Sequence, residues 1–172
     1  MSRSGLLEKL VTPDYARVKR VVDGIIDDLG ITSPPVNPVD VARQLGLEVE
    51  FATFGGKFYG ISGFYDCDSN AIIVNAHEYP LRQTFTVAHE LGHHMLHREW
   101  AKTSEYTMLM RDSDYNGSEA HEKEANAFAG NLLVPRFMLD RYWQSTSVEG
   151  LSKLFAVSVP VIKNRISLEY GV

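Results

Sequence analysis

Two histidines four residues apart enclose a glutamate in the segment His89-Glu90-Leu91-Gly92-His93. In an α-helix, residues four apart lie on one face, so both imidazoles can point toward the same position. A catalytic zinc ion takes three protein ligands, often imidazole nitrogens, and leaves its fourth position to water. Glu90 lies about 100° around the helix from His89, where it could reach that water without binding the ion. The motif therefore predicts a zinc site with two histidine ligands and Glu90 as the catalytic base.

A third protein ligand should come from another helix, and the best source is the run of residues 118–134. On one face of that helix, Glu122 precedes Asn126 and several small residues, which would let two helices approach closely. A carboxylate turned inward is costly unless it meets a cation or a metal ion, so Glu122 is the predicted third ligand. Asn126, one turn later, could accept the outer N–H group of a ligating histidine.

Other titratable residues near the motif have less specific interpretations. His121 and Glu119 are weaker alternatives to Glu122 as the third ligand. Glu124 is expected to point away from the site into solvent. His97 extends the line of the two motif histidines by one more turn, and we predict that it packs beside the site in a structural role.

The elements that must position these residues are mostly helices. Apolar spacing together with start and stop signals predicts helices over residues 13–29, 38–46, 80–97 and 118–134, and two or three short helical pieces over 136–170. Strand-like runs cover 47–54, 58–65 and 71–75. Because turn-forming residues separate these runs, we expect a small antiparallel sheet of about three strands and an α+β fold.

The chain of 172 residues, 44% hydrophobic and 23% charged, predicts one globular domain over 1–172, in which 136–172 form a C-terminal helical subregion that resembles a helix-turn-helix in pattern. Its aliphatic runs fall short of the roughly 20 residues that span a bilayer, and no secretory signal opens the chain. A single cysteine, Cys67, excludes an internal disulfide, so a cytoplasmic location is expected. The net charge of −5 lacks the basic footprint of a nucleic-acid binder.

These residues together resemble the ImmA/IrrE family of small bacterial and phage metallopeptidases. The most specific matches are the motif within residues 82–97 and the run Glu122-Lys123-Glu124-Ala125-Asn126-Ala127-Phe128-Ala129, followed by Leu132-Leu133-Val134-Pro135. Further similarity extends over 37–47, 72–75, 151–158 and 164–166.

The resemblance implies a minimal, gluzincin-like metallopeptidase that cleaves or inactivates a helix-turn-helix transcriptional repressor and so derepresses phage, mobile-element or stress genes. Carried over by position, His89 and His93 match the histidine ligands, Glu90 the catalytic glutamate and Glu122 the glutamate ligand. Zn²⁺ is the expected ion, with Mn²⁺ as the alternative. A separate repressor protein is the expected partner, without direct contact to nucleic acid or membrane.

In the mechanism we expect, Glu90 takes a proton from a zinc-activated water and returns it to the leaving amine. Tyr106 is a candidate donor to the oxyanion, and an edge strand could hold the substrate in an extended form. Three other functions remain open: a non-catalytic antirepressor that sequesters the repressor, a toxin-like partner of an antitoxin, and a DNA-binding regulator. The last is disfavoured because the second helix of the C-terminal pair offers just two cations, Lys163 and Arg165.

Overall fold

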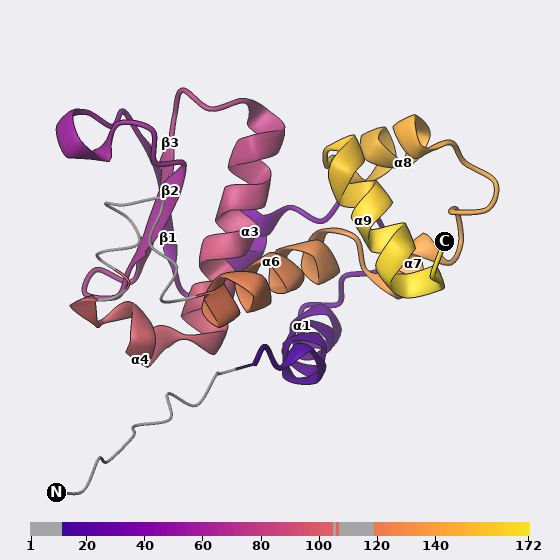
Figure 1. The fold of residues 1–172 in the computed structure, drawn as a ribbon, viewed down its shortest axis with the longest axis horizontal. Helices are drawn as coiled ribbons and strands as arrows, with labels where there is room; N and C mark the ends of the chain where they lie inside the picture. The colour runs from indigo at the N-terminus through magenta and orange to yellow at the C-terminus, as the bar shows by residue number, and fades with distance from the viewer. Residues whose placement is uncertain (1–11, 105, 107–118) are drawn as a thin grey trace, which may run out of the picture.

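A computed structural model describes residues 12–104, 106 and 119–172 of the chain (Figure 1). Its helices are α1 (Tyr15–Asp28), α2 (Pro38–Gln44), α3 (Pro80–Leu96), α4 (Arg98–Ala101), α6 (Glu119–Leu133), α7 (Arg136–Leu139), α8 (Val148–Phe155) and α9 (Val159–Tyr170). The four longer predicted helices and the short C-terminal pieces are thus confirmed, with ends shifted by one or two residues. None of these helices is long and apolar enough to cross a lipid bilayer.

Local capping explains where several helices begin. The Asp14 side chain accepts the backbone N–H of Arg17 at the start of α1, as expected for an N-cap aspartate. Asn37 accepts the N–H groups of Val39 and Asp40 in the same way at the start of α2. Proline stands in the first turn of α2 and of α3, where its missing N–H group costs no hydrogen bond.

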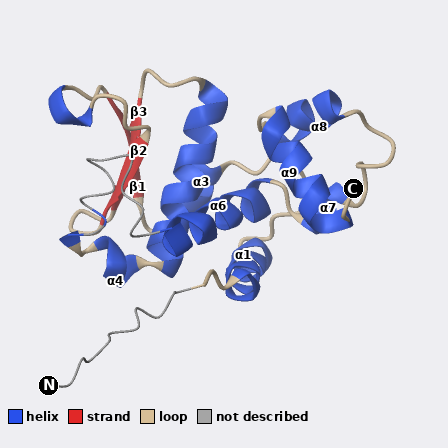
Figure 2. Ribbon diagram, in the orientation of Figure 1, coloured by secondary structure: helices blue, strands red, loops and turns tan. Residues whose placement is uncertain are grey.

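The sheet contains β1 (Glu48–Ala52), β2 (Gly63–Asp66) and β3 (Ala71–Asn75) in the order β1-β3-β2. β2 pairs with β3 in antiparallel fashion, from Gly63 opposite Val74 to Asp66 opposite Ala71. β1 pairs with β3 in parallel. Figure 2 shows the strands together on one side of the molecule, with α3 beside them.

The prediction of a purely antiparallel sheet is therefore wrong for β1. The residues at 55 and 56 do not form a tight hairpin turn, because Gly56–Phe58 make a short 3-10 helix within a longer connection. That connection lets the chain pass over to the far edge of the sheet. The strongly apolar β3, in which Ile72 and Val74 are fully buried, takes the central position between β1 and β2.

Helix α3 lies at the centre of the fold. It contacts the sheet through β2 and β3, and it contacts α6, which crosses it (Figure 1). Its residues Val87, Ala88 and Leu91 are fully buried in the core between these elements. Helix α1 packs on α6, so α6 is covered on two sides. The motif helix is thereby held between a sheet and a second helix that can supply further ligands.

The C-terminal helices α8 and α9 pack on each other. They are joined by a short turn in which Ala156 has a left-handed backbone conformation. Leu151, Phe155 and Ile162 are fully buried in the same apolar cluster as the core of α3 and α6. The side chain of Arg165 is also buried, and its Nε atom donates to the carbonyl oxygen of Val134 over 3.1 Å.

Candidate metal centre

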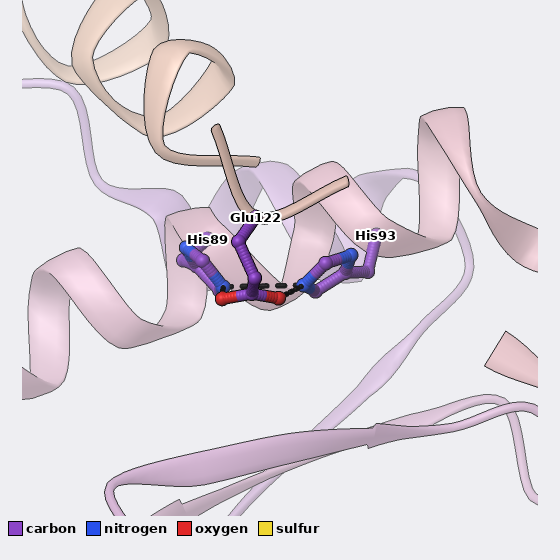
Figure 3. A group of neighbouring side chains, drawn as sticks. All are labelled: His89, His93 and Glu122. Carbon is purple, nitrogen blue, oxygen red and sulfur yellow. Dashed lines mark hydrogen bonds and ion pairs between the residues drawn. The ribbon is translucent and has the colours of Figure 1, made fainter. Parts of the chain in front are cut away.

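The structure brings His89, His93 and Glu122 together, from the helices that the sequence analysis expected (Figure 3). His89 Nε2 lies 3.3 Å from Glu122 Oε2, and His93 Nε2 lies 2.8 Å from Glu122 Oε1. The ligand atoms of all three side chains lie within 4.8 Å of one another. Their role as metal ligands remains a prediction, which the contacts around them support.

Close packing of α6 against α3 makes this convergence possible. A side-chain Cβ added at Gly92 would lie 3.1 Å from atoms of the Phe128 ring, which is tighter than ordinary van der Waals contact. Ala125 and Ala129 on α6 are fully buried as well. Small residues at these positions let the two helix backbones approach, and this approach carries Glu122 over the motif histidines.

Three polar groups converge at the centre. The Nε2 atoms of His89 and His93 lie 3.1 Å apart, and both face the carboxylate of Glu122. Although Glu122 Oε1 is buried and close to His93 Nε2, it accepts no hydrogen bond of acceptable geometry within the described part of the chain. Two imidazole nitrogens and a carboxylate oxygen that converge in this way form a donor set that suits a divalent cation such as Zn²⁺.

Asn126 supports this arrangement as the sequence analysis expected. Its side-chain oxygen lies 2.9 Å from His89 Nδ1. Because an amide oxygen can only accept, His89 donates from Nδ1 in this contact, and the neutral form of the imidazole then has its lone pair on Nε2. The free lone pair therefore points toward Glu122 and is available to a metal ion.

Electrostatics at the centre follow from burial and from close carboxylates. Burial lowers the pKa of His93 to about 4, which keeps this imidazole neutral at physiological pH. Burial acts to raise the pKa of Glu122, but the imidazoles of His89 and His93 outweigh it and lower the pKa. A neutral imidazole and an ionised carboxylate are the protonation states in which these groups bind metals.

Glu90 is buried beside the three residues and is held by Tyr106. Desolvation raises the pKa of Glu90 to about 7, although the neighbouring His89 opposes this effect. The hydroxyl group of Tyr106 donates to Glu90 Oε2 over 3.0 Å and accepts the backbone N–H of Tyr65 over 2.6 Å. A carboxyl group with a pKa near 7 is suited to transfer protons in both directions at neutral pH.

Of the weaker candidates, neither His121 nor Glu119 joins the cluster. The imidazole of His121 stacks on the indole of Trp100, with ring centroids 4.2 Å apart. Glu119 forms an exposed ion pair of 2.6 Å with Lys123.

The prediction that Glu124 faces solvent is wrong. Its carboxylate is buried, and its Oε2 atom lies 2.6 Å from Nε2 of His97. The interpretation missed this contact because it assigned α6 a single buried face, whereas α1 covers a second one. His97 lies beside the site, where its Nδ1 atom is 3.0 Å from His93 Nδ1. In the sequence, the signal for the contact between His93 and His97 was their spacing of four residues.

An open cleft of about 640 Å³ leads to the centre. His89, Glu90 and Glu122 line its floor, and Gly63 at the start of β2 lines one wall. Apolar and basic side chains from α3 and α9 complete the walls, among them Phe85, Arg82 and Val161. A polypeptide segment could therefore reach His89, Glu122 and Glu90 from solvent, whereas the side chain of His93 is buried.

The α+β fold thus brings three candidate metal ligands together at one cleft. Residues 42–167 match the model of the Peptidase M78 family, described as the IrrE N-terminal-like domain. The match covers most of the chain, and the protein belongs to this family. The resemblance inferred from the sequence is thereby confirmed, and membership of a metallopeptidase family implies a metal.

Two similar proteins extend this assignment. The chain is 30% identical to immunity region protein 2 of Bacillus phage phi105 over 130 residues, which are 74% of this chain and 75% of the phage protein. A solved structure of a Mycobacterium tuberculosis transcriptional regulator has a TM-score of 0.66 at 16% identity. The similarity covers 88% of this chain but just 46% of the regulator, and at this identity it concerns the fold. The predicted α+β fold class is confirmed.

Proposed function

We propose that this protein is a zinc-dependent endopeptidase that cleaves a helix-turn-helix transcriptional repressor. The observation that carries the proposal is the convergence of His89, His93 and Glu122, with Glu90 beside them on the floor of an open cleft. A structural zinc site is normally closed by four protein ligands. Here the described residues offer three candidate ligands, of which His89 and Glu122 line the cleft, and the Glu90 carboxylate accepts a hydrogen bond from Tyr106.

Each residue of the centre has a defined part in hydrolysis. A zinc ion held by His89, His93 and Glu122 would polarise the scissile carbonyl and acidify the attacking water. Glu90 would accept a proton from the attacking water and return it to the leaving amine, for which a pKa of about 7 is suitable. Tyr106 donates to the Glu90 carboxylate through its hydroxyl group, and this contact supports a role beside the base rather than at the oxyanion.

The cleft suits an extended segment of a protein substrate. β2 forms one edge of the sheet, and Gly63 at its start lines the cleft beside His89 and Glu90. At Gly63 this edge could bind a peptide through backbone hydrogen bonds, whereas the N–H group of Tyr65 further along β2 already donates to Tyr106. The apolar side chains of Phe85 and Val161, which also line the cleft, would then contact side chains of that peptide.

A repressor is the proposed partner because of the relatives. One comes from a phage immunity region and another is named a transcriptional regulator, which supports our proposal of a role in the control of phage, mobile-element or stress genes. We propose that the chain works as a single metallopeptidase domain over 1–172 in the cytoplasm. The contribution of Ser158 and Val161 of α9 to the cleft supports a C-terminal region that belongs to the same unit.

Direct DNA binding is not part of this proposal. The buried Arg165 is tethered to Val134, so Lys163 alone of the two predicted cations is exposed on α9. One exposed cation neutralises too little phosphate charge for tight binding to DNA.

The test is to identify a helix-turn-helix regulator encoded near its gene, to incubate the zinc-loaded protein with that regulator, and to follow the regulator by mass spectrometry. We expect two defined fragments, and no fragments with the Glu90→Gln variant. An intact regulator that stays bound to both proteins would instead identify a non-catalytic antirepressor. A neighbouring protein that is bound intact and relieves toxicity of this chain would indicate a toxin and its antitoxin.

A further inference from the structure

A chain of buried polar contacts leads from His93 away from the candidate metal centre to the start of α1. His93 Nδ1 lies 3.0 Å from Nδ1 of His97, and His97 Nε2 lies 2.6 Å from Glu124 Oε2. The other oxygen of Glu124 accepts the backbone N–H of Asp14 over 2.7 Å. His93, His97 and Glu124 are between 1% and 7% exposed, so water does not compete with these contacts.

The direction of each hydrogen bond in this series of contacts follows from the contact farthest from the metal centre, between Asp14 and Glu124. The backbone N–H of Asp14 can only donate, so Glu124 is the acceptor in this contact. An ionised carboxylate accepts, so His97 carries a proton on Nε2. The Nδ1 atoms of His97 and His93 share one hydrogen bond, and His93 can offer Nε2 to a metal ion only if it donates from Nδ1, so Nδ1 of His97 accepts with its lone pair. That lone pair faces His93 Nδ1, which must then be the protonated nitrogen of His93.

We infer that His97 and Glu124 are positioning residues for His93, which hold its imidazole in the tautomer whose Nε2 lone pair faces Glu122. The inference rests on the metal site of the proposed function. It gives His93 the same support that Asn126 gives His89, but over two residues instead of one. Outer partners of metal-binding histidines commonly fix the tautomer and the ring orientation in this way.

The same contacts join α3 and α6, the two helices that carry the candidate ligands, to α1. Asp14 is the N-cap of α1, and Nη2 of Arg17 in its first turn donates to the carbonyl oxygen of Leu96 at the end of α3 over 3.0 Å. α1 therefore holds Glu124 on one side and the last turn of α3 on the other. This placement fixes the distance over which His97 must bridge Glu124 and His93.

Replacements at His97 separate positioning from simple packing. His97→Leu keeps an apolar volume but removes the acceptor for His93, whereas His97→Gln offers an oxygen that accepts from His93 and an amide group that donates to Glu124. His94→Leu is the matched control, because His94 lies next to His93 on α3 and contacts Tyr65 instead of His97 or Glu124. Glu124→Gln tests the contact between Glu124 and His97.

Zinc affinity of the full-length variants is measured by competition with a chromophoric chelator. We expect His97→Leu and Glu124→Gln to bind zinc roughly 10- to 100-fold more weakly than the wild type. His97→Gln and His94→Leu should retain the affinity of the wild type. Unchanged affinity in both His97→Leu and Glu124→Gln, combined with a lower melting temperature, would overturn the inference and leave a purely structural pair.

A second measurement reads the tautomer itself. Nitrogen-15 NMR of the imidazoles in the metal-free, full-length protein should place the His93 proton on Nδ1 in the wild type, and on Nε2 or on both nitrogens in His97→Leu. A wild-type proton on Nε2 overturns the inference even if the variants do not fold. If the wild type bound no zinc, the proposed function would fail, whereas the NMR result would still decide the positioning role.

Discussion

The hydroxyl group of Tyr106 joins the backbone of β2 to the carboxylate of Glu90, because it accepts the N–H of Tyr65 over 2.6 Å and donates to Glu90 Oε2 over 3.0 Å. The N–H group fixes the direction of the hydroxyl proton, so the hydrogen bond to Glu90 favours the ionised carboxylate. The sheet edge and the proposed catalytic base are thus parts of one hydrogen-bonded unit.

Tyr106→Phe should reduce kcat/KM by roughly 10- to 100-fold, since a hydrogen bond to a charged group is worth about 1.5–3 kcal/mol. Loss of this donor also raises the pKa of Glu90. The acidic limb of the pH profile of kcat/KM should therefore shift to higher pH in the variant. A profile that falls in height but keeps its midpoint would argue against a hydrogen bond that acts on the base.

Glu90→Gln should abolish cleavage and stabilise the metal-free protein at alkaline pH. Burial raises the pKa of Glu90 from 4.5 to about 7, so the folded state keeps a proton that the unfolded state releases. Ionisation of Glu90 therefore destabilises the fold progressively as pH rises from 4.5 through 7, by up to roughly 3 kcal/mol.

Urea unfolding in the presence of a chelator measures this effect. The free energy of unfolding of Glu90→Gln should exceed that of the wild type at pH 8, and the difference should shrink at pH 5. An equal difference at both pH values would contradict the raised pKa. Glu119→Gln is a suitable control, since Glu119 is exposed and lies outside the cluster.

The helices and the candidate ligands could be predicted because both depend on local spacing. Periodic apolar residues define one helix face, and the interval of four residues places two histidines on it. The parallel pairing of β1 depends on which strand becomes central, and no local pattern encodes that choice. The burial of Glu124 and the contact of Tyr106 with Glu90 likewise arise from packing between distant segments, namely α1 on α6 and residue 106 on β2.

The close approach of α3 and α6 at Gly92 gives a third prediction. Gly92→Val would force side-chain atoms against the Phe128 ring, and overpacking of this kind costs about 1–3 kcal/mol. Because α6 would move outward with Glu122, zinc affinity should fall together with stability. Gly24→Val in α1 is the control, since a Cβ there meets nothing within 4 Å. Full zinc affinity in a destabilised Gly92→Val variant would mean that helix separation does not set the ligand geometry.

The central claim is that His89, His93 and Glu122 hold a divalent metal ion, and the metal content of the purified protein tests it most directly. After expression in zinc-supplemented medium and dialysis against a weak chelator, elemental analysis should find stoichiometric zinc in the wild type and in Glu119→Gln. It should find none in Glu122→Gln, which retains the size of the ligand but removes its charge. A wild-type protein without stoichiometric divalent metal, or a Glu122→Gln variant that keeps its zinc, would contradict the account.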